Sequence, residues 1–594
     1  MTRRPLRPIS QIISARKNGQ NPDHIERENI RQRHLVMEKV TRIRSESRLL
    51  VLIGFFFVSF LAIGLKMGML SMITPAEPIS STQILQTLTK RADILDRNGS
   101  ILATNLITNA LYAKPNLMID KQTAAKELVK IFPDLKLLNL INQFEGTKKF
   151  IWIKRKISPE QMQAVHELGE PGLKFGPREM RLYPNGRLAA HVLGGVRYGR
   201  QSVHSAELVG SAGVELQFDK FLQDKLGSGD PLILSLDLGV QSAIGHVLQG
   251  GMQLMNAKGA AAILMDIHSG EIISMVSLPD FDPNDRVQKT SKKNGSQSSL
   301  FNKAVQGRYE LGSVFKVFTA AMALEDGIVN QNTLVDTSSP IIWGKHRISN
   351  YHRLPEELSF TDVIVKSSNT GTSRLAKELG GVRQKEFLTN LGFFESTGIE
   401  LVEGKQITSQ YPSNWSEIST MTISYGHGIS SSPLHLAAAF ASVLNGGLKV
   451  NPTLLKHNGT DKIRKRVIRS DVSQTLINIL YQVVERGTAS AARVHGYSVA
   501  GKTGTAKKVK PTGGYYNKKN ITTFASVFPA EAPKYVLLVT LDEPVVLTGL
   551  KSRRTAGWTA APISSEIIYR AAPLLGVRPN LQNKINDGLL LVGN

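Results

Sequence analysis

Three short motifs occur in a fixed order along this chain of 594 residues, and they constrain its fold more than any other feature. Ser313-Val-Phe-Lys316 comes first, Ser367-Ser-Asn369 begins 54 residues later, and Lys502-Thr-Gly-Thr505 begins another 135 residues on. One pattern alone is weak, because Ser14-Ala-Arg-Lys17 also fits Ser-x-x-Lys. The ordered set supplies a nucleophile beside an amine, a second hydroxyl with an amide, and a cation on a strand. A fold that brings these groups together can acylate a serine with a peptide that ends in a carboxylate.

The first motif opens a stretch that is apolar nearly all round, Gly312 to Leu324. A helix of this composition is buried, and Ser313 is expected at its N-cap or in its first turn. Lys316 follows three residues later and therefore shares a helix face with Ser313. Because a charged amine is disfavoured in apolar surroundings, we expect the pKa of Lys316 to fall, so that the neutral amine takes the proton of Ser313. For an isolated motif the alternative is a capping serine and a lysine that extends to solvent.

The other two motifs have structural alternatives of their own. Ser367 and Asn369 follow a short helical run, 361–366, and both residue types are common in turns. Lys502 begins a segment of small residues on a predicted edge strand, to which an extended peptide can add. We expect Gly504 to let a ligand approach this backbone closely. A solvated lysine at a strand end is the alternative, and the small residues around Lys502 argue against it.

An uncharged apolar run, Leu49 to Leu65, is followed by Lys66 and by further apolar residues up to Ile73. A membrane span needs about 20 apolar residues, and a lysine near its end can reach the interface. The predicted transmembrane helix is therefore 49–73. The basic residues before it place the N-terminus in the cytoplasm and the rest of the chain in the periplasm. A cleavable signal peptide, the alternative, has a shorter apolar core after a shorter basic region.

Composition narrows the remaining choices. The net charge is +25, and residues 1–48 hold twelve Lys or Arg against five Asp or Glu, so we expect a basic tail that is mostly disordered and can end in a helix leading into the membrane. Neither zinc-finger spacing nor an aromatic-rich basic surface occurs, so no nucleic-acid partner is expected. Cysteine is absent, which excludes disulfides and thiolate metal sites. Phosphate-binding loops, HExxH and dinucleotide-binding motifs are also absent, so neither a metal nor a cofactor is expected.

The sequence pattern changes again near residue 230. Residues 74–230 alternate short β-like runs with turns such as Asp96-Arg-Asn-Gly99, whereas a long helix is predicted beyond them at 239–255. Strands are predicted in this second part at 232–236, 259–266, 271–277, 497–500, 522–528 and 535–541. The predicted class is α+β, with an antiparallel sheet built from distant segments and flanked by helices. The polar stretch 285–299 is predicted to be a mobile surface loop.

Further stretches of the chain resemble one family, the class B penicillin-binding proteins. They are 91–99, 213–215, 270–271, 279–284, 426–428, 445–447 and 556–558. With the three motifs, they make the chain, from about residue 49 to about residue 575, similar to monofunctional peptidoglycan transpeptidases of the cell-division type found in Gram-negative bacteria. The resemblance implies a single-pass anchor, a β-rich pedestal and a penicillin-binding transpeptidase domain. The expected parts are a cytoplasmic tail (1–48), a transmembrane helix (49–73), a periplasmic pedestal of the dimerisation type (74–230), a transpeptidase domain (231–575) and a C-terminal tail (576–594).

The resemblance also implies a reaction. Ser313 would attack the D-Ala–D-Ala bond of a stem peptide with Lys316 as its base, and Ser367 would relay the proton to the leaving nitrogen. The acyl-enzyme would then pass to an amine on a neighbouring strand and form a cross-link. β-Lactams, which are similar to the donor terminus, would acylate the same serine, and no metal or cofactor would take part.

Substrate binding follows from the same resemblance. Asn369 would hold the backbone amide of the substrate. Lys502, with the hydroxyls of Thr503 and Thr505, would bind the terminal carboxylate. Backbone N–H groups of Ser313 and Thr505 would form the oxyanion hole.

Partners and structural residues are implied as well. The partners would be the membrane, a membrane glycosyltransferase of the shape-elongation-division-sporulation type, and division proteins. Residues of the pedestal that match family stretches are expected to form structural ion pairs, namely Arg91, Asp96, Arg97, Arg181 and Glu215. Three alternatives stay open: a carboxypeptidase or β-lactamase, an elongation-type class B transpeptidase, and a non-catalytic division scaffold.

Overall fold

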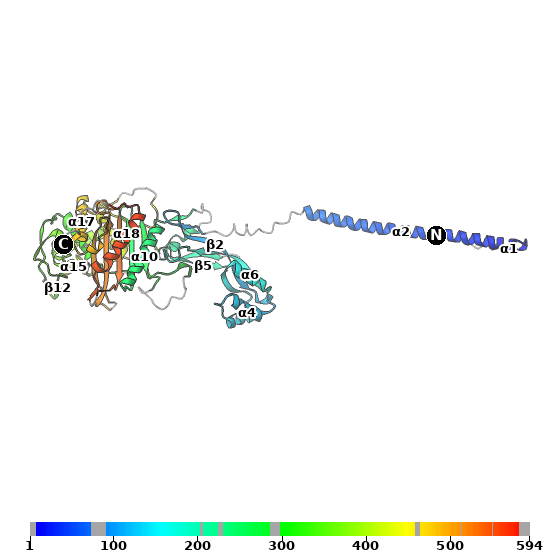
Figure 1. The fold of residues 1–594 in the computed structure, drawn as a ribbon, viewed down its shortest axis with the longest axis horizontal. Helices are drawn as coiled ribbons and strands as arrows, with labels where there is room; N and C mark the ends of the chain where they lie inside the picture. The colour runs from blue at the N-terminus through cyan, green and yellow to red at the C-terminus, as the bar shows by residue number, and fades with distance from the viewer. Residues whose placement is uncertain are drawn as a thin grey trace, which may run out of the picture. The chain divides into compact units, whose positions relative to one another are not determined.

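The computed structural model describes most of the chain, and its ribbon is shown in Figure 1. The described residues are 8–72, 91–201, 206–223, 230–285, 298–457, 464–510, 512–548 and 551–580. They fall into two separate units, residues 1–88 and residues 89–594. Most of the predicted loop at 285–299 and of the C-terminal tail at 576–594 lies outside the described residues.

The described part of the first unit consists of two helices, α1 (Ile9–Lys17) and α2 (Asp23–Met72). Acidic residues in the first turn of α2, Asp23 and Glu26, interact favourably with the positive end of the helix dipole. One turn further on, Gln32 Nε2 donates to Glu28 Oε1 at 3.1 Å. The structure therefore differs from the predicted, mostly disordered tail, because helix covers most of its described residues and continues into the apolar run. The reason is that Glu, Arg, Gln and Lys, which fill this segment, are strong helix formers.

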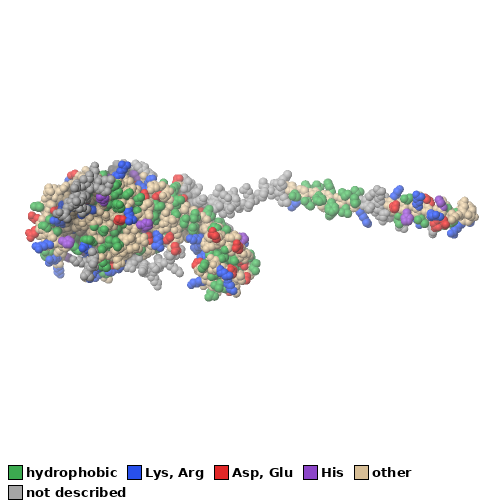
Figure 2. Space-filling view, viewed as in Figure 1, with side chains coloured by type: hydrophobic (Ala, Val, Ile, Leu, Met, Phe, Trp, Pro, Cys, Tyr) green, Lys and Arg blue, Asp and Glu red, His purple; other side chains and the backbone are tan. Residues whose placement is uncertain are grey.

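Part of α2 is long and apolar enough to cross a membrane, Arg48–Met69, and it is the one such helix among the described residues. Its 22 residues span about 33 Å at the usual rise, close to the thickness of a hydrocarbon core. The apolar side chains along it, such as Phe57 and Leu61, are exposed (Figure 2). The predicted span at 49–73 thus coincides with this segment to within a few residues.

The second unit begins with a β-rich region, residues 91–233, which we call the pedestal region. Its main sheet contains β1 (Ile94–Leu95), β2 (Ile101–Ala113), β3 (Ile151–Ile157), β4 (Leu173–Leu182) and β7 (Leu232–Ile233). A separate hairpin is formed by β5 (Gly195–Gln201) and β6 (Ala206–Ala212), and the helices are α4 (Lys121–Ile131), α5 (Leu137–Glu145), α6 (Pro159–Glu167), α7 (Ala190–Leu193), α8 (Gly213–Gln217) and α9 (Asp219–Leu222). Residues from α4, α5 and β3, including Leu128, Phe144 and Ile151, form a small hydrophobic core of their own.

A buried carboxylate organises the pedestal region. Glu215 is fully buried and accepts from Arg91 Nε and from Arg181 Nε, each at 2.7 Å, and from the hydroxyl of Tyr183 at 3.2 Å. Two guanidinium groups and a hydroxyl compensate the loss of hydration that a lone buried carboxylate would suffer. These contacts agree with the structural ion pairs predicted for Arg91, Arg181 and Glu215.

Of the other two residues predicted to form ion pairs, Arg97 does so and Asp96 has a different role. Arg97 lies 3.2 Å from Glu271 and so forms the expected kind of pair. Asp96 differs, because its carboxylate accepts hydrogen bonds from the backbone N–H groups of Asn98, Ser100 and Leu238. Asp96 therefore fixes a turn, which its position in an Asp-x-x-Gly turn favours.

The largest sheet of the transpeptidase-like part, beyond residue 233, has five antiparallel strands in the order β14-β15-β16-β8-β9. Its strands are β8 (Gly259–Asp266), β9 (Ile272–Leu278), β14 (Ala500–Val509), β15 (Tyr515–Phe528) and β16 (Tyr535–Asp542). The hairpin β8–β9 and the edge position of β14 agree with the prediction. The predicted strand at 497–500 instead begins at Ala500 and runs on to Val509, because the N–H of Tyr497 closes a turn with the carbonyl of Val494 at 3.1 Å.

The predicted strand at 232–236 is mostly absent from the described structure. Only β7 remains, and it pairs in parallel with β1 of the pedestal region. The next residues bond elsewhere, since the N–H of Ser235 donates to the carbonyl of Leu454 at 2.7 Å. Chain segments on either side of residue 230 are therefore joined by a shared sheet.

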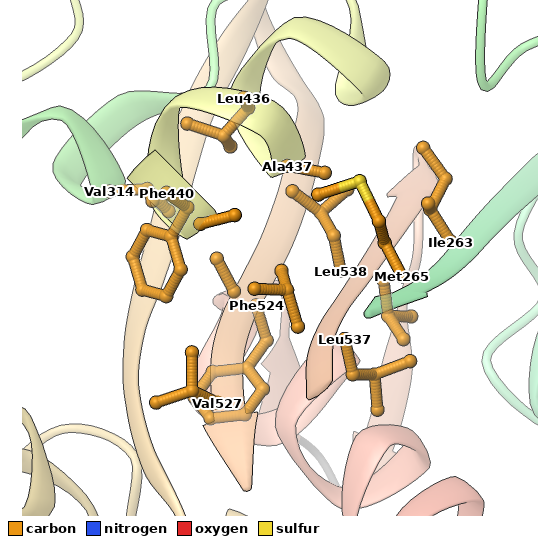
Figure 3. Packing of buried hydrophobic residues seen from close by; sticks show 14 of the residues in the cluster. Ile263, Met265, Val314, Leu436, Ala437, Phe440, Phe524, Val527, Leu537 and Leu538 are labelled. Carbon is orange, nitrogen blue, oxygen red and sulfur yellow. The ribbon is translucent and has the colours of Figure 1, made fainter. Parts of the chain in front are cut away.

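Helices cover both faces of the five-stranded sheet. On one face α10 (Leu238–Leu254) and α18 (Ala560–Leu574) contact each other and the strands. On the other face α16 (Pro433–Leu444) contacts β8 and β16. Figure 3 shows Leu538 beside Ala437 of α16, whereas its neighbour Leu537 lies lower, toward the other face. This alternation is what successive residues of a buried strand require. The α+β class with helices flanking an antiparallel sheet is thus confirmed.

The remaining α-helices and strands of the described structure lie between residues 316 and 553 of the chain. They are α11 (Lys316–Glu325), α12 (Phe360–Val365), α13 (Asn369–Leu379), α14 (Gly381–Asn390), α15 (Glu417–Ile423), α17 (Ser470–Arg486), β10 (Leu334–Asp336), β11 (Ile341–Trp343), β12 (His346–Ile348), β13 (Glu357–Ser359), β17 (Val546–Thr548) and β18 (Lys551–Arg553). Of these, α17 packs against β14 and α11 packs against α13 and α17. The three motifs therefore lie on elements that contact one another.

Candidate active site

The first motif lies at the start of a buried helix, as predicted. A 3-10 turn, Gly312–Phe315, leads directly into α11, of which Lys316 to Leu324 are all buried. Ser313 lies in that first turn and is only partly buried, but no side chain caps the helix start. Of the two expected positions for Ser313, the structure thus gives the first turn.

Two glycines allow the turn that holds Ser313, Gly312–Phe315, to pack closely against β14. Gly312 has a φ of +62°, and a Cβ there would lie 2.7 Å from the carbonyl oxygen of Thr505. A Cβ at Gly504 would lie 2.1 Å from the carbonyl oxygen of Leu311. Gly504 thus allows a close approach of the chain's own Leu311, and its predicted role toward a ligand stays a prediction.

The second motif occupies a strained turn between α12 and α13. Ser367 has a φ of +59°, which is uncommon for a residue with a side chain and is often retained where function requires it. The next residue, Ser368, caps α13 by accepting from the N–H of Gly371 at 3.0 Å. The Oγ of Ser367 lies 3.0 Å from Lys316 Nζ and 3.0 Å from Lys502 Nζ. Groups from all three motifs therefore meet at one hydroxyl.

Lys316 is held by the second motif. Its Nζ donates to the carbonyl of Ser367 at 2.6 Å and to Asn369 Oδ1 at 2.7 Å, in addition to its contact with Ser367 Oγ. Ser313 Oγ makes no hydrogen bond with any described residue. The predicted pairing of Ser313 with Lys316 is therefore not formed in this structure, since the amine is turned toward Ser367 and Asn369.

Burial controls the charge of the two lysines. Burial, and then the nearby Lys502, lower the pKa of Lys316 well below its usual value, in the direction predicted from the sequence. Burial alone lowers the pKa of Lys502 to about 7. A neutral Lys316 amine has two donors for the Ser367 carbonyl and for Asn369, and a lone pair that accepts from the Ser367 hydroxyl. A carboxylate bound near Lys502 would favour its charged form.

The third motif contributes Lys502 directly to this cluster and the two threonines to its surroundings. Lys502 is fully buried. Thr503 Oγ1 shares a hydrogen bond of 2.9 Å with Thr488 Oγ1, and Thr505 Oγ1 accepts from the N–H of Ala556 at 2.9 Å. Since β14 is an edge strand, one side of its backbone is free of partner strands along the sheet.

Sequence reasoning missed Asn350, which holds the second motif in place. Its Oδ1 accepts from the N–H of Asn369 at 2.8 Å, from the N–H of Thr370 at 3.1 Å and from Ser368 Oγ at 3.1 Å. The carbonyl of its neighbour Ser349 accepts from Asn369 Nδ2 at 2.9 Å, which orients the amide. No motif or periodicity marks an asparagine in a loop, so the sequence carried no signal for this role.

We expect Asn350→Ala to slow acylation by fluorescent penicillin by about 10- to 100-fold, because several donors lose their acceptor and the motif loses its fixed geometry. The rate constant is measured from gel-resolved labelling of the full chain in detergent. Asn332→Ala, in an exposed position of a nearby loop, is the matched control and should label like the unaltered chain. A rate for Asn350→Ala within twofold of the control would show that Asn350 does not position the motif.

Two family models match the chain. Residues 260–569 match the penicillin binding protein transpeptidase domain, and residues 86–229 match the penicillin-binding protein dimerisation domain. The first match includes all three motifs and covers more than half of the chain.

Curated relatives match over most of their length. A probable peptidoglycan D,D-transpeptidase FtsI from Caulobacter vibrioides is 32% identical over 554 residues, which cover 91% of this chain and 90% of the relative. The peptidoglycan D,D-transpeptidase FtsI of Escherichia coli K12 is 27% identical over 539 residues, covering 86% of this chain and 88% of the relative. Among solved structures, penicillin-binding protein 3 from Mycobacterium tuberculosis, complexed with aztreonam, aligns with a TM-score of 0.63 at 24% identity over 83% of this chain and 98% of that one.

These matches confirm the resemblance drawn from the sequence and the reaction class that it implies. The structural alignment supports the fold alone, whereas the relatives and the family models extend over the motif residues as well. The chain belongs to the penicillin-binding protein transpeptidase family.

Proposed function

We propose that this chain is a peptidoglycan D,D-transpeptidase of cell division, which cross-links stem peptides through an acyl-enzyme on Ser313. The observation that carries the proposal is the contact of Lys316 Nζ and Lys502 Nζ with Ser367 Oγ, each at 3.0 Å. Two buried amines around one hydroxyl are costly to desolvate, so a fold that keeps them is expected to use them. The match to the transpeptidase family over these same residues supports the proposal.

In the first half of the proposed reaction, Ser313 Oγ attacks the carbonyl carbon of the penultimate D-Ala. Its proton passes to the neutral amine of Lys316, and the C–N bond to the terminal D-Ala breaks. The hydroxyl of Ser367, hydrogen-bonded to that amine, delivers a proton to the leaving nitrogen. The lowered pKa of Lys316 supports this role, because only a neutral amine can act as a base.

Binding of the donor peptide is proposed to use the remaining motif residues. Lys502 with Thr503 and Thr505 binds the terminal carboxylate, and the amide of Asn369 holds the peptide backbone. The backbone N–H groups of Ser313 and Thr505 stabilise the oxyanion, and the contact between their two segments supports this arrangement. Gly504 serves this binding indirectly, because it admits the nucleophile turn against β14.

In the second half, the amine of a neighbouring stem peptide attacks the ester on Ser313. A new amide bond forms, the bond from carbonyl carbon to Oγ breaks, and Ser313 regains its proton. β-Lactams enter the first half in place of the donor and leave a stable ester on the same serine.

The membrane arrangement is proposed from the N-terminal unit. The apolar segment of α2 is a single-pass anchor in the cytoplasmic membrane, with residues 1–48 in the cytoplasm and the pedestal and transpeptidase domains, 74–230 and 231–575, in the periplasm. The basic residues just before the anchor support this orientation. A membrane glycosyltransferase and division proteins are the proposed partners, with the pedestal as their contact region.

A division role is favoured over the alternatives by the relatives that bear the name FtsI. A scaffold without catalysis is disfavoured by the intact cluster of Lys316, Ser367, Asn369 and Lys502. Depletion in the native host would separate a division role from an elongation role, since filamentous cells indicate division and round cells indicate elongation.

The activity is tested with the full chain in detergent, a stem pentapeptide ending in D-Ala–D-Ala and a second stem peptide with a free amine. We expect free D-Ala together with a cross-linked dimer of the expected mass, both abolished by prior incubation with penicillin. Free D-Ala without a dimer would indicate a carboxypeptidase. Neither product, together with no covalent penicillin, would indicate a scaffold.

A further inference from the structure

A histidine outside the three motifs lies over the segment that leads to the nucleophile. His427 stands between two glycines that are both fixed to that segment. A Cβ at Gly426 would lie 2.2 Å from the carbonyl oxygen of Gly312, and the N–H of Gly428 donates to Glu310 Oε1 at 3.0 Å. The loop of His427 is therefore anchored, on both sides of the histidine, to residues within three positions of Ser313.

The imidazole of His427 contacts the carboxyl group of Glu310 through one ring nitrogen and stacks on two tyrosine rings. Its Nδ1 lies 3.2 Å from Oε2 of Glu310, whose side chain is 5% exposed, whereas that of His427 is 45% exposed. The ring stacks on Tyr515 at 4.9 Å and on Tyr425 at 6.2 Å between centroids. Tyr515 also donates its hydroxyl to Glu310 Oε1 at 2.7 Å. Among the described residues, Nε2 of His427 has no hydrogen-bond partner.

This arrangement is that of a general base. Glu310 Oε2 is buried, has no hydrogen-bond partner among the described residues and lies 3.2 Å from Nδ1, so a proton on Nδ1 would satisfy it and leave Nε2 free to accept another. The other titratable groups that face it are Tyr425 on its own loop and Tyr515 on β15. Burial and the charge of Glu310 raise the pKa of Tyr425 to about 12 and raise that of Tyr515 as well. Both tyrosines therefore stay neutral near pH 7, and Glu310 is the carboxyl group that faces the ring.

The second half of the proposed reaction needs a proton acceptor in addition to Lys316. The acceptor arrives as an ammonium group, and with a pKa of about 10.4 fewer than about one amine in a thousand is neutral at pH 7. To become an amide nitrogen, the ammonium must lose two protons. Lys316 can take one of them during attack and return it to Ser313 Oγ as the ester breaks. The first proton needs another acceptor beside the incoming amine, and His427 is a group of that kind outside the three motifs.

We propose that His427 is the catalytic base that deprotonates the ammonium group of the acceptor peptide before it attacks the acyl-enzyme. The inference rests on the proposed transpeptidase function and assigns the acceptor's side of the same site. Nε2 takes the first proton and releases it to solvent, and the lone pair so freed forms the bond to the ester carbon. The acceptor is thus a peptide with a primary amine, delivered to the exposed edge of the imidazole.

His427→Asn tests the proposal in the full chain in detergent, because its amide N–H can still donate to Glu310 but it has no basic nitrogen. An acyl-D-alanyl thioester is the donor, and stem tripeptides ending in lysine or in diaminopimelate are the acceptors. We expect at least a tenfold lower rate of transfer to the amine at pH 7, within the range for a general base. The deficit should shrink as the pH approaches that of the amine's own deprotonation. His346→Asn, an exposed histidine on β12, is the matched control.

Acylation by fluorescent penicillin is measured in the same samples, and the proposal requires that transfer to the amine falls at least tenfold more than acylation. Glu310→Gln is the second variant, since its oxygen can still accept from Gly428 and Tyr515 while its amide forces the wrong tautomer on His427. Equal losses in acylation and transfer at every pH would show a purely structural latch and overturn the proposal. Normal transfer in His427→Asn would overturn the role of His427 and leave the transpeptidase function standing. Failure of the unaltered chain to react with penicillin would overturn both.

Discussion

A chain with Ser313→Ala is expected to take up no covalent penicillin, a loss of at least about 10⁴-fold in acylation rate, as for the removal of other catalytic serines. The ester needs an oxygen at this position, and Ser367 Oγ cannot replace it because two lysines already engage that atom. Mass spectrometry of the unaltered chain should place the acyl group on the tryptic peptide Tyr309 to Lys316, which contains one serine.

The chain contains its own control for this experiment. Ser14 and Lys17 have the same Ser-x-x-Lys spacing, but both are exposed on α1. Ser14→Ala should therefore label at the rate of the unaltered chain. Covalent label that persists in Ser313→Ala would place the nucleophile elsewhere and remove the basis of the proposed reaction.

Lys316→Met is expected to lower the acylation rate by about 10²- to 10⁴-fold, the usual contribution of a general base. Methionine keeps most of the side-chain length and suits the buried site, but it cannot accept the proton of Ser313. Lys316→Arg should be similarly slow, because a guanidinium stays charged although it can still donate hydrogen bonds. An arginine variant with normal acylation would show that the position needs a cation and not a base.

The pH dependence of acylation separates the two lysines. Lys316 must be neutral, so the rate should be lost as the pH falls through its lowered pKa. Lys502 must be charged, so the rate should decline again above its pKa of about 7 in the free chain. Lys316→Met should lack the acid limb, and Lys366→Met, at an exposed lysine beside the second motif, should keep the normal profile. An acid limb that survives in Lys316→Met would have to belong to another group.

Local sequence patterns were sufficient for much of this fold. The alternation and turn signals predicted the β8–β9 hairpin, the central strands β15 and β16, and the buried helix behind Ser313, because periodicity and burial are linked. The tail was mistaken for disorder, since it has no apolar face, although its residues favour a helix. The start of β14 was predicted too early, because Tyr497 belongs to a turn that precedes the strand.

Only the site residues that belong to the three motifs could be predicted from the sequence. Lys316, Ser367, Asn369 and Lys502 are brought together in the structure, whereas the positive φ of Ser367 has no signature in its sequence. Asn350 and Glu310 were missed for the same reason, since their contacts connect loops and follow no periodicity. Gly504 was recognised as a place of close approach, but which atoms approach depends on how the nucleophile turn packs on β14.

The order of strands in the central sheet has a consequence for when the enzyme becomes vulnerable. β8 lies between β9 and β16, and β16 lies more than 250 residues later in the chain, at 535–542. At typical synthesis rates of about 5–20 residues per second, the early hairpin waits roughly 13 to 50 seconds for its neighbour. Non-local pairing of this kind also folds slowly. Because Lys502 is carried on β14, which joins the sheet only through β15 and β16, the proposed reaction requires these last strands, and we expect a β-lactam to capture only molecules in which they are already in place.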